Sequence, residues 1–291
     1  MKQIAIISGK GGTGKTTLSS SLALLLENHI LADCDADAPN IYLLFGPKIK
    51  DKFDFFGGKK AIIDYKKCTN CGKCAKTCRF DAIEYKNNHY VINQYKCEGC
   101  GACTIICPVN AITLEKSKAG EFFNSETESI PLVHGRLYPG EDASGGLVSE
   151  IRNLAIKEAE KQDKKLILID GAPGIGCPAI SSVTGTNYVI IVTEPTVSGI
   201  HDLKRAIKMV QHFKIPFSIV INKYDINEGK TKEIEEFCAK EGFSILGKIP
   251  FDEEVEKATR NQKPVIVYKN SKAANSIKEI FKKLKEMLKE V

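Results

Sequence analysis

Residues 8–17, SGKGGTGKTT, decide the fold of this 291-residue chain. The motif follows an apolar run at residues 3–8, QIAIIS, and opens a helix-like stretch at residues 15–28. Glycine lets a backbone approach a phosphate group closely and present its N–H groups to it. Because the motif stands between a predicted strand and a predicted helix, it predicts a loop that binds the phosphates of a nucleotide.

The side chains of this loop have separate predicted roles. Lys15 is placed to reach the β- and γ-phosphates of ATP, and the Thr16 hydroxyl is placed to bind Mg²⁺. The loop residues expected to bind the nucleotide are Gly11, Gly12, Thr13, Gly14, Lys15, Thr16 and Thr17. A glycine-rich turn without a ligand is the alternative, and the agreement of motif and context argues against it.

Short apolar runs alternate with helix-like stretches through most of the chain. Buried strands such as LILID at residues 166–170 and YVIIVT at 188–193 are separated by predicted helices. Two extended segments, EFFNSE at 121–126 and PLVHGRLY at 131–138, are expected to form a hairpin or edge strands. Strands that alternate with helices favour an α/β fold, in which a mostly parallel sheet has helices on both faces.

A cysteine-rich block interrupts this alternation. Eight of the 11 cysteines lie between residues 68 and 107, in two runs of the pattern C-x₂-C-x₂-C-x₃-C that begin 29 residues apart. This spacing is typical of bacterial ferredoxins that hold two [4Fe–4S] clusters. We therefore predict a small α+β ferredoxin domain at residues 58–117, inserted in a nucleotide-binding domain formed by residues 1–57 and 118–291.

The spacing also predicts which cysteines share a cluster, because the fourth thiolate of each run binds the other cluster. The predicted ligands of the first cluster are Cys68, Cys71, Cys74 and Cys107. Those of the second are Cys97, Cys100, Cys103 and Cys78. Zinc is the alternative, because paired cysteines also bind Zn²⁺, but a duplicated four-cysteine run favours iron–sulfur clusters. Arg79 stands where proline usually follows the run, which removes no ligand.

The net charge of +6 comes from the cysteine-rich block. Residues 59–118 contain 11 Lys and Arg against 5 Asp and Glu, so the rest of the chain is about neutral. Anionic clusters would offset this excess, so we expect no nucleic-acid partner. No apolar run approaches the roughly 20 residues of a membrane span, and no leader peptide is recognisable, so we expect a cytoplasmic protein.

Lys10, the additional lysine in KGGTGKT, distinguishes this sequence from most other phosphate-binding loops. The sequence resembles the deviant P-loop of the MinD/ParA/Mrp ATPases and of the nitrogenase iron protein, over nearly the whole chain outside the insert. In that family the extra lysine crosses a face-to-face dimer to contact the partner's nucleotide. The resemblance implies a deviant P-loop NTPase fold and an ATP-dependent homodimer. It also implies hydrolysis of ATP to ADP and phosphate, with Lys10, Lys15 and Asp35 as catalytic residues.

The resemblance implies further site residues. Asp33 and Asp35 match the family's switch I carboxylates, and Asp35 is the better candidate to arrange Mg²⁺ and the attacking water. Asp170 matches the second Mg²⁺-binding carboxylate, so the expected Mg²⁺ ligands are Thr16, Asp35 and Asp170. The residues expected to contact the adenine base are Asn222, Pro250 and Asp252.

Three functions follow from the resemblance and remain open at this point. The first is nucleotide-gated electron transfer through the clusters to a redox partner, since the insert directly follows switch I. The second is an iron–sulfur carrier or assembly ATPase like the Mrp proteins, which serves an acceptor protein. Against it, the chain has no CxxC motif after the insert to hold a transferable cluster. The third is a spatial organiser like MinD, with a redox-sensing module.

Two weaker signals concern the second half of the chain. Cys177 follows Asp170 by seven residues, an offset comparable to that of a cluster-binding cysteine in the nitrogenase iron protein. Because residues 116–169 contain no second cysteine, we expect a structural role for it. Residues 275–291 predict an amphipathic helix that packs on the sheet, with membrane binding as the alternative. Its apolar face comprises Ile277, Ile280, Phe281, Leu284, Met287 and Leu288.

Overall fold

The computed structural model describes residues 1–142 and 144–290, and for residues 288–290 it describes the backbone alone. The chain divides into two compact units. Unit 1 comprises Met1–Phe53, Phe122–Arg136 and Ser144–Val291, and unit 2 comprises Asp54–Glu121 and Leu137–Ala143.

Two long strands, β3 (Lys48–Ile63) and β6 (Ile112–Glu126), have residues in both units. The boundaries expected at residues 57 and 118 fall inside these strands, because a continuous strand carries no local signal where one unit ends. The sequence of β3, KIKDKFDFFGGKKAII, carries no strand prediction, since charged residues and two glycines obscure its pattern.

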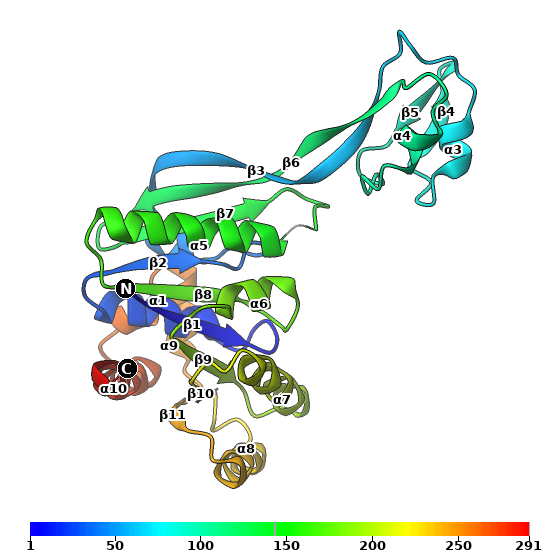
Figure 1. Ribbon diagram of the computed structural model, residues 1–291. Helices are drawn as coiled ribbons and strands as arrows, with labels where there is room; N and C mark the ends of the chain where they lie inside the picture. Colours follow the sequence, from blue (N-terminus) through cyan, green and yellow to red (C-terminus); the bar gives the residue numbers. More distant parts are fainter. Residues whose placement is uncertain (143, 291) are drawn as a thin grey trace. The chain divides into compact units, whose positions relative to one another are not determined.

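A nine-stranded sheet runs through unit 1 in the order β11-β10-β9-β1-β8-β2-β7-β6-β3 (Figure 1). Every pair from β11 to β7 is parallel. These strands are β1 (Lys2–Ser8), β2 (His29–Asp33), β7 (Pro131–Leu137), β8 (Leu166–Pro173), β9 (Tyr188–Thr193), β10 (Phe217–Asn222) and β11 (Ile245–Ile249). β7 lies between β2 and β6, so residues 131–138 do not form an edge strand. β6 and β7 are neighbours in the sheet, joined by a turn at residues 127–130, which agrees with the alternative prediction of a hairpin.

Helices cover both faces of this sheet, as the apolar strands require. α1 (Lys15–Leu25), α9 (Glu253–Arg260) and α10 (Lys272–Glu290) share one hydrophobic core with sheet residues such as Ile4 and Ile6. The helices that pack on the other face, in front in Figure 1, are α5 (Ser144–Lys161), α6 (Cys177–Val183) and α7 (Val197–His212). This arrangement confirms the predicted α/β fold. The remaining elements of unit 1 are α2 (Ile41–Phe45), α8 (Glu228–Glu241) and the 3₁₀ turn Val265–Val267.

The last helix, α10, packs by its apolar face against this core, as predicted. Ile277, Ile280 and Leu284 are buried, and Phe281 and Met287 are partly buried beside them. Leu288, predicted on the same face, lies outside the described side chains. Among the described residues, no helix has both the length and the apolar character needed to cross a membrane.

Unit 2 shows the internal repeat of the cysteine runs. Its short helices α3 (Lys73–Thr77) and α4 (Ala102–Ile106) occupy positions 29 residues apart. β4 (Ile83–Lys86) and β5 (His89–Ile92) pair as an antiparallel hairpin. The buried core of the unit is small, and consists of Ala61, Ile63, Cys74, Ile83 and Ile112.

Candidate functional site

The loop between β1 and α1 forms an open concavity. Gly12 and Gly14 have φ angles of 81° and 89°, a left-handed conformation that glycine adopts readily. A Cβ atom at Gly11 or Gly12 would meet nothing within 4 Å, so this side of the loop has room for a ligand. The loop leads into the N-terminus of α1, where an anion is stabilised by the helix dipole and free N–H groups.

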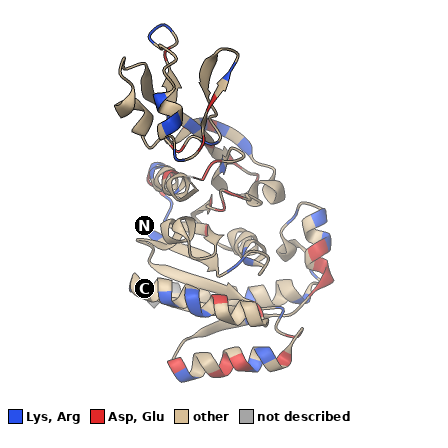
Figure 2. Cartoon of the chain, turned by 90° about the vertical axis from the view of Figure 1, so that its right-hand side faces the viewer, with Lys and Arg blue, Asp and Glu red and all other residues tan. Residues whose placement is uncertain are grey.

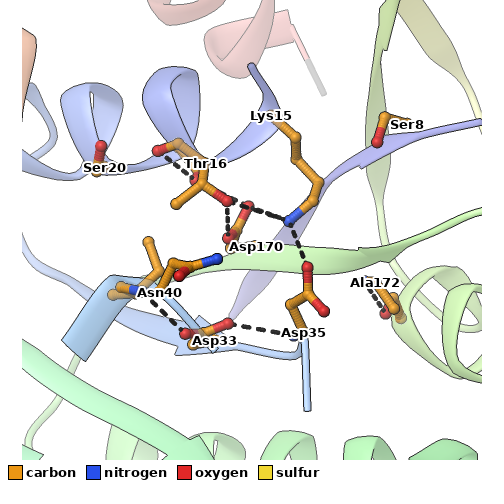
Figure 3. Close-up of polar contacts among 12 residues, drawn as sticks. Ser8, Lys15, Thr16, Ser20, Asp33, Asp35, Asn40, Asp170 and Ala172 are labelled. Atoms are coloured by element: carbon orange, nitrogen blue, oxygen red, sulfur yellow. Dashed lines mark hydrogen bonds and ion pairs between the residues drawn. The ribbon is translucent and has the colours of Figure 1, made fainter. Parts of the chain in front are cut away.

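A buried polar centre lies beside the loop (Figure 3). Lys15 Nζ is 2.9 Å from Asp170 Oδ1 and 3.7 Å from Asp35 Oδ2. The hydroxyls of Thr16 and Ser19 donate to the two oxygens of Asp170 at 2.9 and 2.8 Å. Burial alone would lower the pKa of Lys15, but Asp170 and Asp35 outweigh it and raise this pKa. The ammonium group is therefore charged and held by carboxylates.

Asp33, the last residue of β2, and Asp35, in the segment that follows, have different surroundings. Asp33 is buried, and its oxygens accept the N–H groups of Asp35 at 3.1 Å and of Ile41 at 3.2 Å. Burial and the neighbouring Asp170 raise the pKa of Asp33 to about 8. Asp33 therefore shapes the segment, while Asp35 faces the open cavity described next.

A cavity of about 460 Å³ lies over the loop. It is lined by every loop residue from Gly11 to Thr17, and by Asp35 and Pro173. The Thr13 hydroxyl is buried and has no hydrogen-bond partner among the described residues, as expected of a group that a ligand completes. The cavity combines an ammonium group, hydroxyls and carboxylates, which are the groups that bind phosphate and Mg²⁺.

A second cavity, of about 200 Å³, adjoins the loop at Thr17. Its lining includes all three residues expected to contact the base, Asn222, Pro250 and Asp252. Asn222 Nδ2 donates to the carbonyl oxygen of Thr13 at 2.8 Å, so this side chain braces the loop. Asp252 caps α9 and also accepts the Ser271 hydroxyl at 2.7 Å. Its carboxylate therefore stabilises the wall of the cavity.

Lys10 does not line either cavity among the described residues. Its Nζ lies 2.8 Å from Glu194 Oε1 and donates to Ser198 Oγ at 2.9 Å. Glu194 also lies 3.3 Å from Lys223 Nζ, which donates to the Gly12 carbonyl oxygen at 3.4 Å. Burial would raise the pKa of Glu194, but the two lysines lower it. Lys10 is therefore paired with Glu194 of the same chain.

Two cavities in unit 2 each collect four cysteines. One is lined by Cys68, Cys71, Cys74 and Cys107. The other is lined by Cys78, Cys97, Cys100 and Cys103. In both, the fourth cysteine of one run joins the first three of the other run, and apolar residues such as Ile63 and Ile83 complete the wall.

The fourth cysteine of each run, Cys78 or Cys107, accepts a backbone hydrogen bond in the same way. The N–H of Ala82 donates to Cys78 Sγ at 3.4 Å, and the N–H of Ala111 donates to Cys107 Sγ at 3.2 Å. Such donors stabilise a thiolate, the form of cysteine that binds metals. Each run therefore fixes its fourth sulfur with its own backbone.

The spacing of the sulfurs bears on what these cavities can hold. Within the described part of the chain, no three His, Cys, Asp or Glu side chains converge closely enough to bind a single metal ion. Each of the two cysteine cavities has a volume of about 20 Å³. Four thiols with apolar neighbours are the kind of donor set that binds an iron–sulfur cluster.

Three residues near the sites carry no individual sequence prediction. Ser19 follows Thr16 by three residues on α1 and so shares its face, a signal that the sequence contains. Phe251 is 52% exposed in the base cavity and belongs to the segment IPFD at 249–252, which resembles the family's second base-contacting loop. Glu194 belongs to TEPT at 193–196, which resembles a family signature, but its pairing with Lys10 has no local signal. Cys177 is exposed at the first position of α6 and lines neither cysteine cavity.

Known proteins resemble this chain over almost all of its length. An uncharacterized protein of Methanocaldococcus jannaschii is 39% identical over 289 residues, which are 98% of this chain and 97% of that protein. An iron–sulfur cluster carrier protein of Pyrococcus furiosus is 24% identical over 311 residues, covering 99% of this chain and 87% of that protein.

The solved structure of the septum site-determining protein MinD from Pyrococcus horikoshii, complexed with Mg-ADP, has the same fold. It superposes with a TM-score of 0.61 at 19% identity, and the match covers 99% of this chain and 97% of that one. The profile of the CobQ/CobB/MinD/ParA nucleotide-binding domain matches residues 4–265, which include the phosphate loop, Asp35, Asp170 and Asn222. The chain therefore belongs to the CobQ/CobB/MinD/ParA family of nucleotide-binding proteins.

Proposed function

We propose that this protein is an ATPase that couples nucleotide binding and hydrolysis to electron transfer through two [4Fe–4S] clusters. The pair of four-cysteine cavities in unit 2 is the observation that carries the proposal. Unit 1 supports it with a phosphate cavity that contains the charged groups needed for hydrolysis. One protein with both sites has the parts of a nucleotide-controlled electron carrier.

Hydrolysis depends on positioned cations, metal and water around the transferred phosphoryl group. Lys15, which pairs with Asp170 in the free protein, turns to the β- and γ-phosphates when ATP binds. Asp170 and Thr16 are then available to hold Mg²⁺, which neutralises phosphate charge, and Asp35 orients the attacking water. Lys10 leaves Glu194 and completes the charge at the partner's nucleotide in an ATP-dependent homodimer.

The cysteine cavities of unit 2 are suited to resident clusters. Each cluster would be bound by four thiolates of a single chain, and each, when bound, stores one electron. The chain's own part is to supply thiolates, to donate N–H groups to their sulfurs, and to place apolar side chains beside them. Hydrogen bonds and burial of this kind tune a cluster's reduction potential.

A line of contacts within unit 1 leads from the phosphate cavity to β6. Asp33 holds the first residue of α2, Ile41, by a 3.2 Å hydrogen bond. The next residue, Tyr42, stacks on His134 of β7 with ring centroids 6.1 Å apart. His134 Nε2 is hydrogen-bonded to Ser125 Oγ of β6 at 3.0 Å. Because β6 continues into unit 2, movement of the Asp35 segment on ATP binding has a route toward the cysteines.

An iron–sulfur carrier is the second candidate, because relatives from three Pyrococcus species bear that name at 23–24% identity. A carrier must release its cluster, whereas each cavity here is lined by four cysteines of one chain, of which Cys71 and Cys100 are exposed. Cys177, which is exposed and lies outside both cavities, is the thiol that a carrier role would have to use. Four ligands supplied by a single chain are the ground on which we prefer conduction by resident clusters over release.

The test is anaerobic reconstitution of the full chain, followed by EPR of the reduced protein with and without ATP. We expect about eight iron and eight sulfide per chain, and a change in potential or spectrum on ATP binding that Lys15→Ala abolishes. Cys78→Ser should disturb the cluster bound by the second run, while Cys177→Ser serves as the matched control and should leave iron content unchanged.

Three results would contradict the proposal. Stoichiometric zinc without sulfide would exclude the clusters. Loss of a cluster to an apo-ferredoxin on ATP hydrolysis would show a carrier. Clusters whose EPR spectrum and reduction potential do not change when ATP binds would show that the two units are not coupled.

A further inference from the structure

The two cysteine runs of unit 2 have the same cysteine spacing but differ in their exposed side chains. The first run carries three exposed cationic residues in and after α3: Lys73, Lys76 and Arg79. The residues 29 positions later, in the second run, are Ala102, Ile105 and Pro108. Each half of the repeat therefore keeps its cysteines, while only the first half is basic. Figure 2 shows the Lys and Arg residues in blue.

Apolar side chains are exposed beside both runs. Ile105 is 87% exposed and Ile106 is 42% exposed on α4, and Phe80, just after α3, is 41% exposed. α3 and α4 pack against each other, so the basic and the apolar residues belong to adjoining helices. We call this surface the α3–α4 face. It comprises Lys73, Lys76, Arg79, Phe80, Ile105 and Ile106.

An apolar patch with charges at its margin is the usual make-up of a protein docking surface. The apolar residues supply contact area, and the charges raise the rate of encounter with a partner of opposite sign. α3 contains Cys74 and α4 contains Cys103, so this face carries a ligand of each four-cysteine cavity. A partner bound here would therefore lie close to both proposed clusters.

We propose that the α3–α4 face docks a small acidic redox protein, which exchanges single electrons with the clusters. This inference rests on the proposed function. In the exchange, the partner's reduced centre gives up one electron and one cluster accepts it, while no bond or proton moves. The basic first run selects a partner with carboxylates around its redox centre, and Ile105 and Ile106 fill an apolar contact at the middle of the interface.

The experiment measures binding of an acidic flavodoxin, used as the probe, to the iron-loaded full chain by calorimetry at low and high salt. We expect binding that weakens steeply with salt, because the attraction is between exposed charges. Lys73→Glu combined with Lys76→Glu should weaken it by about tenfold or more at low salt. Ile105→Ala should weaken it about fivefold at either salt concentration.

The matched control carries the same charge change at exposed lysines of unit 1: Lys208→Glu on α7 combined with Lys232→Glu on α8. It should bind flavodoxin within about twofold of the wild type at high salt, and clearly more tightly than the α3–α4 variant at low salt. The visible spectrum and sulfide content of every variant show whether the clusters are intact. Absence of clusters would refute the proposed function, whereas intact clusters with equal flavodoxin binding by all variants would refute the docking face alone.

Two other outcomes would also overturn the inference. A basic cytochrome c that binds as tightly as flavodoxin would show that charge does not select the partner. Anionic phospholipid vesicles that bind through the same residues, with no flavodoxin binding, would identify the face as a membrane contact instead.

Discussion

The buried pair of Lys15 and Asp170 makes a quantitative prediction for the nucleotide-free protein. The two charges are 2.9 Å apart, and both side chains are almost fully buried, at 6% and 1% exposure. Asp170→Asn keeps the shape of the side chain and removes its charge. It leaves the Lys15 ammonium with Asp35, 3.7 Å away, as its nearest carboxylate.

The expected loss of stability follows from the removed charge. Coulomb's law at an effective dielectric constant of about 20 gives roughly 6 kcal/mol for charges at this separation. A buried amide costs less free energy of desolvation than a buried carboxylate, and its oxygen still accepts a hydrogen bond. Both effects offset part of that loss. We expect the free energy of unfolding to fall by about 3 kcal/mol. Lys15→Met combined with Asp170→Asn should recover most of it, because neither charge then remains buried.

Urea unfolding followed by circular dichroism, without nucleotide, measures these differences. With an m-value of about 3 kcal/mol/M, the midpoint of Asp170→Asn should fall by about 1 M urea. Glu126→Gln is the matched control, because its pair with Lys50 is also short, at 2.7 Å, but about half exposed. It should change stability by less than about 0.5 kcal/mol. Equal stability of Asp170→Asn and wild type, or a double variant less stable than the single one, would refute the argument.

Three further predictions concern assembly, a free thiol and pH. Lys10→Ala should weaken ATP-dependent dimerisation of a hydrolysis-blocked protein in sedimentation experiments, and monomers at every ATP concentration in the Lys10-containing protein would exclude the dimer. Cys177→Ser should leave ATPase activity within about twofold, and a loss of iron would contradict the structural role. Burial lowers the pKa values of His29 and His134 to about 4, so the folded protein keeps them neutral while the unfolded chain protonates them below about pH 6.5. Their contribution is complete above pH 6.5 and is lost as the pH falls toward 4, by up to about 3 kcal/mol for each. Thermal unfolding of the cluster-free chain should show this loss, and His134→Gln should flatten it.

The sequence predicts the parts of this protein that depend on local spacing. Residues 8–17 predict the phosphate loop because the glycines, the lysine and the threonine act within one turn between a strand and a helix. The cysteine spacing predicts two sets of ligands, each with three cysteines of one run and the fourth of the other, and one cavity is lined by each set. The parallel sheet is confirmed because its strands are short apolar runs.

The features that the sequence does not predict are contacts between distant segments. Glu194 pairs with Lys10, and Tyr42 stacks on His134, only because the folded sheet brings their strands together. No local pattern marks such partners. The sequence also does not separate the roles of Asp33 and Asp35, which lie two residues apart. In the structure Asp33 is buried, whereas Asp35 lines the cavity.

The small core of unit 2 has a consequence for how the protein responds to iron supply. Among the described residues, five buried side chains form that core; Cys74 is one of them, and five more cysteines pack against it. If the cysteines bind clusters as proposed, so small a core makes the free energy of metal binding part of the free energy of folding of this segment. Unit 1 has an extensive core of its own, so we expect its folding not to depend on metal. A cell short of iron would then hold a chain that still binds ATP, while the segment between β3 and β6 remains unfolded and open to proteases.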